Sequence, residues 1–252
     1  MEGNESVKVG CNRLAMFLLG ATLALGFAFS AYLLASGLVK MKQDSMIRVK
    51  GLSSKRVKSD QASWSCTIRR QAPTVQAGYL ALEESRTATT GFMQAAGFGE
   101  NEMWINAIDC SPQFKLDDKG NKTNTIESYV LTQSISAASA DVNKIDRISK
   151  AISTLLKSGI ELHSDAPRFT YSGLEAIKLD LLGAATKNAY ERAKTLASNS
   201  GGNVGKLNAA SQGVFQITPP SSTETSEEGC NDTGSIEKDV RCVVTLEFLV
   251  EK

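Results

Sequence analysis

The sequence predicts an α+β domain in which antiparallel β-sheets pack against helices, preceded by a single apolar helix. The first observation is an uncharged apolar run, Leu14–Val39, near the amino terminus. The second is that the rest of the chain contains two patterns: apolar residues at every second position, typical of strands, and apolar residues every three or four positions, typical of helices. The third is that strand segments follow one another across polar turns, which favours antiparallel pairing beside one-sided helices.

Length and charge limit the classes of function. The chain has 252 residues, enough for one large domain or two small ones with a hydrophobic core. Its 28 Lys and Arg residues oppose 27 Asp and Glu residues, which gives a formal net charge of +1. Domains that bind nucleic acids usually carry a basic excess, so we expect no nucleic acid partner.

The apolar run is long enough to span a membrane. At a rise of about 1.5 Å per residue it exceeds the ~30 Å hydrocarbon core of a bilayer. We therefore predict a short cytoplasmic segment at residues 1–13, a transmembrane signal anchor at 14–39 and a charged stalk at 40–45. A cleaved signal peptide is the rival interpretation, because Ala28–Ser30 offers small residues to a peptidase, although the run continues beyond the about 7–15 residues of a cleavable core. A buried helix of a soluble domain is the third.

The charges and the cysteines give opposite indications of orientation. More Lys and Arg residues lie just after the run than just before it, which by the positive-inside rule would leave the following domain in the cytoplasm. An even set of cysteines follows the run, as is typical of an oxidising compartment: Cys66, Cys110, Cys230 and Cys242. We follow the cysteines and predict a single-pass protein of the inner (cytoplasmic) membrane whose domain, residues 46–252, lies in the periplasm or outside the cell.

The amino-terminal half of this domain is expected to contain strands and one helix. Residues 46–70 are predicted to be extended, because apolar and polar residues alternate in their second half. A helix is predicted over 73–96. Two strands are predicted at 102–115 and 125–138, and turn-forming residues at 116–121 join them as a hairpin.

The carboxyl-terminal half begins with the clearest helix of the chain. Asp141 is predicted to be its N-cap and Gly159 its left-handed C-cap, with apolar residues on one face between them. A strand near 168–171 precedes a long helix at about 174–198, whose buried seam is rich in alanine and permits close packing.

Two final strands are predicted at about 204–218 and 239–250. The polar connection Pro219–Lys238 between them is much longer than the usual hairpin loop of about 2–5 residues. Two interpretations stay open: a solvated loop tied down at Cys230, or an arm that contacts a partner.

Several segments stand in a distinctive order and spacing: Ile47–Gly51, Val57 with Asp60 and Ala62, Ser111–Phe114, Ala189–Ala197 and Gly201–Leu207. In this order and spacing the chain resembles the SIMPL domain family, which includes the bacterial periplasmic YggE-like proteins. The resemblance covers residues 46–252 and implies an exported domain, with ring-like oligomers in some members and a link to oxidative-stress defence in others. It implies no catalytic residues. The long anchor and the cysteines depart from the usual family pattern.

Three motifs that suggest chemistry are better explained by structure. His163 is the only histidine, so a Ser-His-Asp triad would require it and a multi-histidine metal site is excluded; we expect it in a surface loop. Gly201–Gly205 follows a helix, whereas a phosphate-binding loop precedes one, so it is interpreted as a cap and turn. Asp117–Asn121 lacks the ligand spacing of a calcium loop and is interpreted as a hairpin tip. No catalytic, cofactor-binding or metal-binding residue is predicted.

The four cysteines after the apolar run allow three disulfide pairings, which the sequence does not distinguish. We expect Cys230 to pair with Cys242, and Cys66 to pair with Cys110 between neighbouring strands. The chain has no CxxC motif for zinc or redox chemistry, so structural bridges or buried thiols are favoured over a reactive site.

The sequence favours a membrane-anchored, non-enzymatic envelope protein without a cofactor. We expect it to form a homo-oligomer or to contact other envelope proteins, and the family resemblance suggests a role in oxidative-stress defence. One alternative is an enzyme or ligand-binding protein whose site forms between subunits. Another is a thiol-based redox-responsive protein that uses the cysteines.

Overall fold

The computed structural model describes residues 13–43 and 45–251 of the chain. These residues form two compact units. The first contains the residues up to Val49, the segment Glu191–Ala210 and the residues from Leu246 onward. The second contains Lys50–Tyr190 and Ser211–Thr245.

Helix α1, Arg13–Gln43, contains the predicted anchor and continues through most of the predicted stalk. Its segment Met16–Gly37 has a mean hydropathy of 1.9 and no buried residues, so by length and composition it can cross a membrane. The hydroxyl of Thr22 donates to the Leu19 carbonyl at 2.9 Å, which satisfies this polar group inside the helix. Most of the predicted cytoplasmic segment, residues 1–12, lies outside the described part of the chain.

The predicted extended segment 46–70 consists of two strands that enter different sheets. Strand β1 is Met46–Lys58 and strand β2 is Gln61–Ala72. The extended segment is interrupted at Ser59 and Asp60, between β1 and β2. The Ser59 N–H donates to the Ile236 carbonyl at 2.8 Å. The Asp60 carboxylate accepts the N–H of Ser172 at 2.8 Å and also its hydroxyl.

Sheet B has five strands in the order β3–β4–β2–β5, and β6 also pairs with β2. The predicted hairpin is confirmed as β3, Met103–Leu116, and β4, Lys122–Ser139. The two short strands are β5, Leu162–Ser164, and β6, Arg168–Thr170. Both β3 and β2 pair antiparallel with β4.

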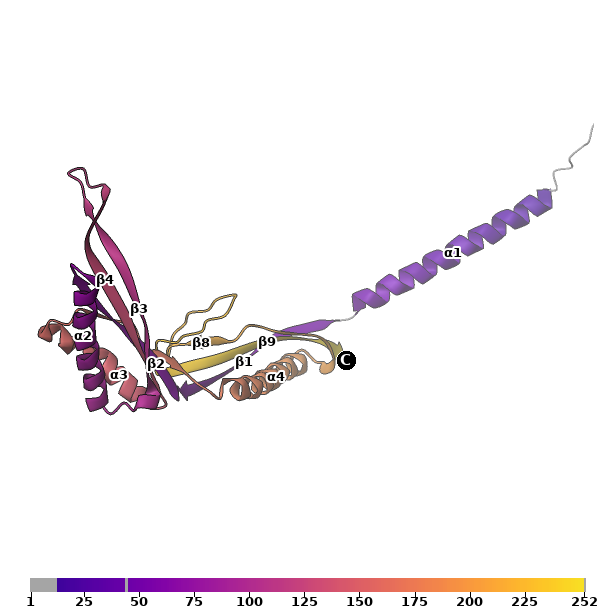
Figure 1. Ribbon diagram of the computed structural model, residues 1–252. Coiled ribbons are helices and arrows are strands. Elements are labelled where there is room, and N and C mark those ends of the chain that lie inside the picture. Colours follow the sequence, from indigo (N-terminus) through magenta and orange to yellow (C-terminus); the bar gives the residue numbers. More distant parts are fainter. Residues whose placement is uncertain (1–12, 44, 252) are drawn as a thin grey trace, which may run out of the picture. The chain divides into compact units, whose positions relative to one another are not determined.

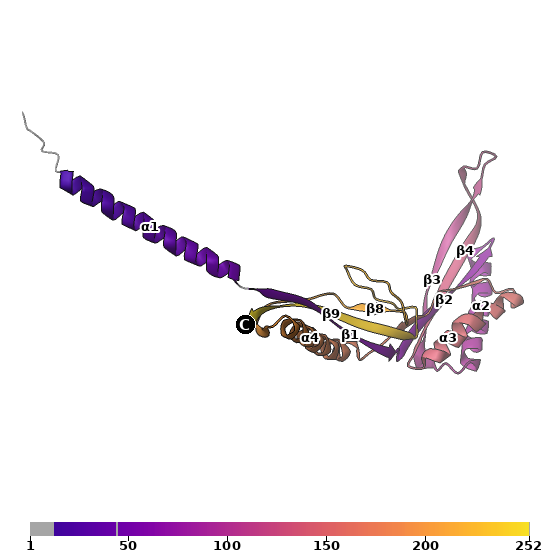
Figure 2. The same ribbon diagram turned by 180° about the vertical axis from the view of Figure 1, so that it is seen from behind.

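Helices α2, Val75–Ala95, and α3, Val142–Ala151, cover one face of sheet B (Figures 1 and 2). The predicted caps of the second helix are confirmed. The Asp141 carboxylate accepts two backbone N–H groups of the first turn, and Gly159 has a φ of 74° at the end of the 3₁₀ segment Ile152–Ser158 that extends α3.

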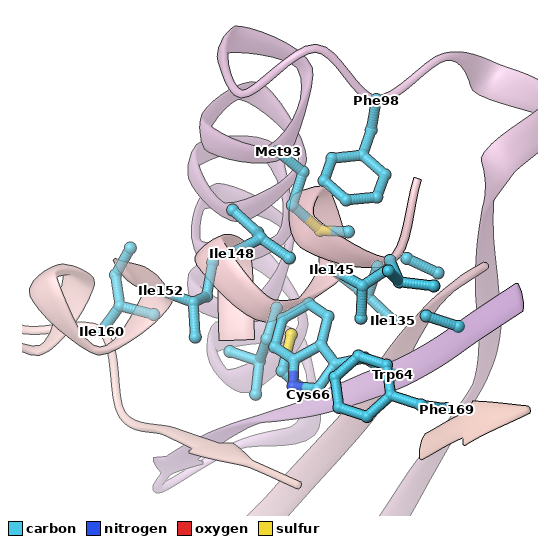
Figure 3. Close-up of a cluster of buried hydrophobic side chains, with 14 of the residues drawn as sticks. Trp64, Cys66, Met93, Phe98, Ile135, Ile145, Ile148, Ile152, Ile160 and Phe169 are labelled. Carbon is cyan, nitrogen blue, oxygen red and sulfur yellow. The ribbon is translucent and has the colours of Figure 1, made fainter. Parts of the chain in front are cut away.

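The core of sheet B fills the space between the strands and these helices (Figure 3). Alternate residues of β2 point into it, as the sequence pattern predicts. Large side chains from α2, α3 and the segment after α2 complete the cluster, which excludes water from the helix-covered face. Its labelled members are Trp64, Cys66, Met93, Phe98, Ile135, Ile145, Ile148, Ile152, Ile160 and Phe169.

Sheet A has four strands in the order β1–β9–β7, and β8 also pairs with β9. Strand β7 is Asn203–Gln212, β8 is Gln216–Thr218 and β9 is Glu237–Glu251. Helix α4, Leu174–Asn199, has the predicted alanine seam, which is buried at Ala185, Ala189 and Ala193. Near its end the seam continues at Ala197 and not at Leu196, which was expected on it and is exposed.

Helix α4 approaches β1 very closely at Gly51. A Cβ atom at Gly51 would lie 2.7 Å from both the backbone N and the Cβ of Ala189, and closer still to the Ala185 carbonyl oxygen. The side chain of Asn188 accepts the Leu52 N–H at 3.2 Å, so the helix also binds the strand backbone. Only the absence of a side chain at Gly51 permits this contact.

Candidate functional site

The face of sheet B that points away from α2 and α3 carries hydroxyl groups. On β2 and β4 they alternate with the core residues of the covered face. The register places Ser65 opposite Ser136 and Thr67 opposite Ser134. The hydroxyl oxygens of Thr67 and Ser134 lie 2.8 Å apart. We call this surface the hydroxyl face; its members are Ser63, Ser65, Thr67, Thr132, Ser134 and Ser136.

A groove with a volume of about 710 Å³, here the hydroxyl groove, lies against this face. Trp104 of β3 pairs with Ser136, and Arg168 of β6 pairs with Ser63. Residues that pair directly across strands point to the same side, so the indole and the guanidinium both belong to this face. Trp104 is 51% exposed, which is unusual for so large an aromatic side chain. Asp165 forms part of the groove wall beside them.

The wall at Asp165 is held in place from the core. The indole N–H of the buried Trp64 donates to the Ser164 hydroxyl at 3.0 Å and to the Asp165 carbonyl at 3.1 Å. The Asp165 N–H donates to the Ser65 carbonyl at 3.0 Å. The groove therefore has a wall whose backbone is fixed by hydrogen bonds on two sides.

His163 lies near Ser65 and Asp165, but not in the arrangement of a catalytic triad. The Asp165 carboxylate accepts a hydrogen bond from the Ser65 hydroxyl through one oxygen, and its other oxygen lies 3.5 Å from His163 Nε2. The carboxylate thus separates the serine from the imidazole, whereas in a triad the imidazole contacts the serine. In this geometry His163 cannot take the Ser65 proton. His163 is exposed as expected, in the short strand β5 rather than in a loop.

Cys66, Cys110, Cys230 and Cys242 all have free thiols. The expected Cys66–Cys110 bridge assumed neighbouring strands, and this assumption is wrong, because β4 lies between β2 and β3. Cys66 lies opposite Ile135 and Cys110 opposite Leu131. Two strand spacings of about 4.8 Å already exceed the ~7 Å between Cα atoms that a disulfide permits.

The expected Cys230–Cys242 bridge meets the same obstacle. The Ile217 N–H of β8 donates to the Cys230 carbonyl at 2.8 Å, and Ile217 also pairs with Val240 of β9. Strand β8 therefore lies between the two cysteines. Neither bridge fits this arrangement of strands.

The four thiols differ in reactivity. Burial raises the pKa of Cys66 to about 12, and burial also raises the pKa of Cys242. Since the thiolate is the reactive form, both are inert in the folded protein. Cys110 is exposed on β3, which is an edge strand of sheet B.

The long connection before β9 is tied to the fold at two buried polar side chains. The Gln216 amide donates to the Ser226 carbonyl at 2.6 Å and accepts the Cys230 N–H at 2.9 Å. The Lys238 ammonium, 3% exposed, donates to the Asp232 carbonyl at 2.7 Å and lies 3.3 Å from its carboxylate. Burial lowers the pKa of Lys238, and Asp232 opposes that shift. The connection is therefore attached at more points than Cys230 alone.

The two remaining motifs have the structural roles that the sequence indicates. Gly201 has a φ of 77° after α4, and the Gly202 N–H donates to the Ala197 carbonyl at 2.9 Å, which is a helix C-cap. The Asp117 carboxylate accepts the Asn121 N–H at 2.8 Å within the turn between β3 and β4, and these hydrogen bonds lower its pKa. In the described residues, no group of three or more His, Cys, Asp and Glu side chains is placed to hold a metal ion.

The hydroxyl groove was not foreseen from the sequence. The alternation along residues 61–72 indicates one wet strand face, but not which other strands share it. Trp104 and Arg168 come from segments far apart in the chain, and only the pairing of β3 and β6 with the central strands brings them to the same face.

A protein-family model described as SIMPL, "Protein of unknown function (DUF541)", matches residues 47–248 of the chain. The search of curated proteins found no match to the chain. The matched residues include every strand of sheet B and the whole hydroxyl groove.

Proposed function

The chain belongs to the SIMPL family, and from that premise we propose that it is a membrane-tethered, non-enzymatic envelope protein whose SIMPL domain self-associates outside the cytoplasmic membrane. Helix α1 supplies the tether. A role in oxidative-stress defence is the physiological context that the family resemblance suggests. Self-association is the part of the proposal that the geometry supports most directly.

The observation that carries it is the outer part of the β3–β4 hairpin. Pairing between β2 and β4 ends at Tyr129, so residues 113–128 form a ribbon of only two strands. Figure 1 shows this ribbon continuing past the end of α2. A two-stranded ribbon with no further strand or helix against it is marginally stable in water.

This ribbon carries apolar side chains that the described part of the chain does not cover. Phe114 and Ile126 pair across the hairpin and so share a face, and Leu116 follows two residues after Phe114. Their exposed fractions are 36%, 44% and 63%, in the order Phe114, Ile126, Leu116. We call Phe114, Leu116 and Ile126 the hairpin-tip patch. A second copy of the chain that packs against this patch would bury it and add the layer that the two-stranded ribbon lacks.

The proposed location follows from α1 and from the exported domain that the family resemblance implies. A tether and a cleaved signal sequence both need an apolar helix near the amino terminus, and Met16–Gly37 meets that need. The cysteines give less support than the sequence suggested, because neither expected intramolecular bridge fits the strand order. The non-enzymatic proposal is supported by the order of groups around Asp165, which keeps His163 away from the Ser65 hydroxyl, so these three side chains do not form a Ser-His-Asp triad.

The test is the mass of the full chain in a mild detergent, measured by light scattering over a range of protein concentrations. The wild-type chain is expected to be an oligomer. The double variant Phe114→Ser/Leu116→Ser is expected to be a monomer, because it removes most of the hairpin-tip patch. A matched control is Leu179→Ser, which replaces a residue that is 72% exposed on α4 and should leave the mass unchanged. A monomeric wild-type chain at every concentration, or an oligomer that the double variant does not alter, would refute self-association through this patch.

A thiol-based redox response is the second candidate, and one observation favours it. Cys110 is exposed and free, whereas burial holds Cys66 and Cys242 in the thiol form. This narrows the redox alternative to Cys110 and the half-buried Cys230. Peroxide sensitivity of cells that carry Cys110→Ser/Cys230→Ser in place of the wild-type chain tests it, since unchanged sensitivity would eliminate this candidate.

A further inference from the structure

We propose that the hydroxyl groove of sheet B binds a short acidic oligosaccharide, with one sugar ring on the Trp104 indole and a sugar carboxylate at Arg168. This inference goes beyond self-association and concerns a different surface. It depends on the proposed function only for the compartment in which the ligand is met, because envelope glycans lie outside the cytoplasmic membrane.

The dimensions of the groove suit a ligand of this class. One row of residues crosses the sheet from Trp104 through Ser136 and Ser65 to Asp165. Three strand spacings of about 4.8 Å give a row about 14 Å long, which matches a chain of two or three sugar rings. The volume of about 710 Å³ lies in the usual range of small-molecule sites, about 300–1,000 Å³.

The chemistry of the row also suits a sugar. The face of an indole carries partial negative charge and attracts the C–H groups on the flat side of a pyranose ring. The Ser136 hydroxyl can donate and accept hydrogen bonds, the Ser65 hydroxyl, whose proton goes to Asp165, can accept them, and the Asp165 carboxylate accepts them from sugar hydroxyls. A floor of hydroxyl groups is a poor match for the apolar centre of a protein–protein interface. The groove therefore favours a polyhydroxylated ligand over a second copy of the chain.

Arg168 is the reason to expect an acidic ligand. It lies opposite Ser63, one step along β2 from the Ser65 row, and it forms no ion pair with any residue that the structure describes. A guanidinium binds a carboxylate through two parallel hydrogen bonds. Binding at this position should therefore discriminate between an acidic sugar and its neutral counterpart.

The site is largely preorganised. Trp64 fixes the backbone at Asp165. The N–H of Phe169, the residue after Arg168, donates to the Thr233 carbonyl at 2.7 Å and fixes the backbone there. Trp104 pairs with Ser136 just before an irregularity between Ile105 and Ile108, and this pairing with β4 fixes its backbone. Little backbone freedom is lost on binding, which reduces the entropic cost of holding a flexible glycan.

The test measures binding of two matched disaccharides to the full chain in a detergent without a sugar headgroup. The acidic probe is N-acetylglucosaminyl-N-acetylmuramic acid, and the neutral probe is the N-acetylglucosamine dimer, which lacks the lactyl carboxylate. Isothermal calorimetry reports affinity. Tryptophan fluorescence reports contact with the ring, because the chain contains two tryptophans and Trp64 is buried. We expect the acidic probe to bind at least tenfold more tightly than the neutral one and to change the fluorescence.

Variants separate the two contacts. Trp104→Ala should weaken both probes at least tenfold, and Trp104→Phe should retain most of the affinity. Arg168→Ala should remove the preference for the acidic probe and leave the neutral probe unchanged. The matched controls are Tyr79→Ala, an exposed aromatic residue on α2, and Arg147→Ala, an exposed arginine on α3; both should bind like the wild type.

Three outcomes would overturn the inference: no binding of either probe at millimolar concentration, binding that Trp104→Ala does not weaken, or equal affinity for the two probes. A lower oligomeric mass of Trp104→Ala, without any binding of the probes, would assign the groove to a second copy instead. These results are independent of the hairpin-tip variants, so the failure of self-association and the failure of glycan binding can be told apart.

Discussion

The same substitution, glycine to alanine, should have opposite effects at two positions around α4. Gly51 of β1 meets the helix backbone, whereas Gly183, an exposed residue within α4, has no atom within 4 Å of the position that a Cβ would take. Gly51→Ala must therefore push strand and helix apart, and Gly183→Ala adds a methyl group in open space. Comparing the two isolates the contact from any general effect of losing a glycine.

The magnitudes follow from the contacts. At Gly51 the obstacles are the Ala189 backbone N and Cβ at 2.7 Å and the Ala185 carbonyl oxygen, which are parts of a rigid helix rather than movable side chains. Overpacking of this kind costs about 3 kcal/mol. At Gly183, alanine removes the entropic cost of glycine in a helix and should stabilise the protein by about 0.5–1 kcal/mol.

The assay is thermal unfolding of the full chain in detergent, followed by near-ultraviolet circular dichroism. For a domain of this size a change of 1 kcal/mol shifts Tm by about 2–4 °C, so Gly51→Ala should lower Tm by about 6–12 °C and Gly183→Ala should raise it by about 1–4 °C. The double variant Gly51→Ala/Ala189→Gly should recover little, because the Ala185 carbonyl remains in the way. A Gly51→Ala protein with the wild-type Tm would refute the close approach of β1 and α4.

Three further predictions concern buried or paired polar groups. Glu102, in the 3₁₀ turn Glu100–Glu102 before β3, accepts hydrogen bonds from Lys144 and Ser139, each at 2.6 Å, and from the Gly99 N–H, which together lower its pKa from 4.5 to about 2. A lowered carboxylate pKa contributes stability that is complete above about pH 4.5 and is lost as the pH falls through about 2. The Tm deficit of Glu102→Gln relative to the wild type should therefore be constant above pH 4.5 and disappear as the pH falls to about 2, while the exposed Glu100→Gln should show no deficit. A deficit that does not change with pH down to about pH 2 would contradict the lowered pKa of Glu102. Lys238→Met should lower the free energy of unfolding, measured with denaturant, by about 2–4 kcal/mol, because it leaves the Asp232 carboxylate without its buried partner. The double variant Lys238→Met/Asp232→Asn should recover much of that loss. Equal stability of the single variant and the wild type would show that this ion pair does not hold the connection before β9. In native alkylation followed by peptide mapping, Cys110 should react quickly, and Cys66 and Cys242 should react only after denaturation, so rapid labelling of Cys66 would contradict its place in the core.

Local signals predicted most of the elements. Asp141 and Gly159 mark the ends of their helix because a side-chain acceptor at the first turn and a left-handed residue at the last are short-range requirements. The alternation in β2 and the alanine seam of α4 were likewise readable, because each depends on the period of one element.

The features that were missed depend on contacts between distant segments. The break between β1 and β2 has no glycine or proline to mark it; it is held by Asp60, which binds Ser172 far along the chain. The hairpin was readable, but not which of its strands meets β2, and that choice separates Cys66 from Cys110. The attachment of the long connection did leave a trace, because Lys238 occupies an inward position in the alternation of β9.

The proposed function depends most on a tether in the membrane and a folded domain on its outer side. Cys110 offers a direct probe, because its thiol is exposed and free. Spheroplasts are treated with a maleimide that cannot cross membranes, before and after permeabilisation, and Cys110 labelling is quantified by peptide mapping with the membrane fraction analysed for the uncleaved chain. We expect equal labelling of Cys110 in both samples, on a chain that stays with the membrane. Labelling that appears only after permeabilisation would place the domain in the cytoplasm and contradict the proposed function.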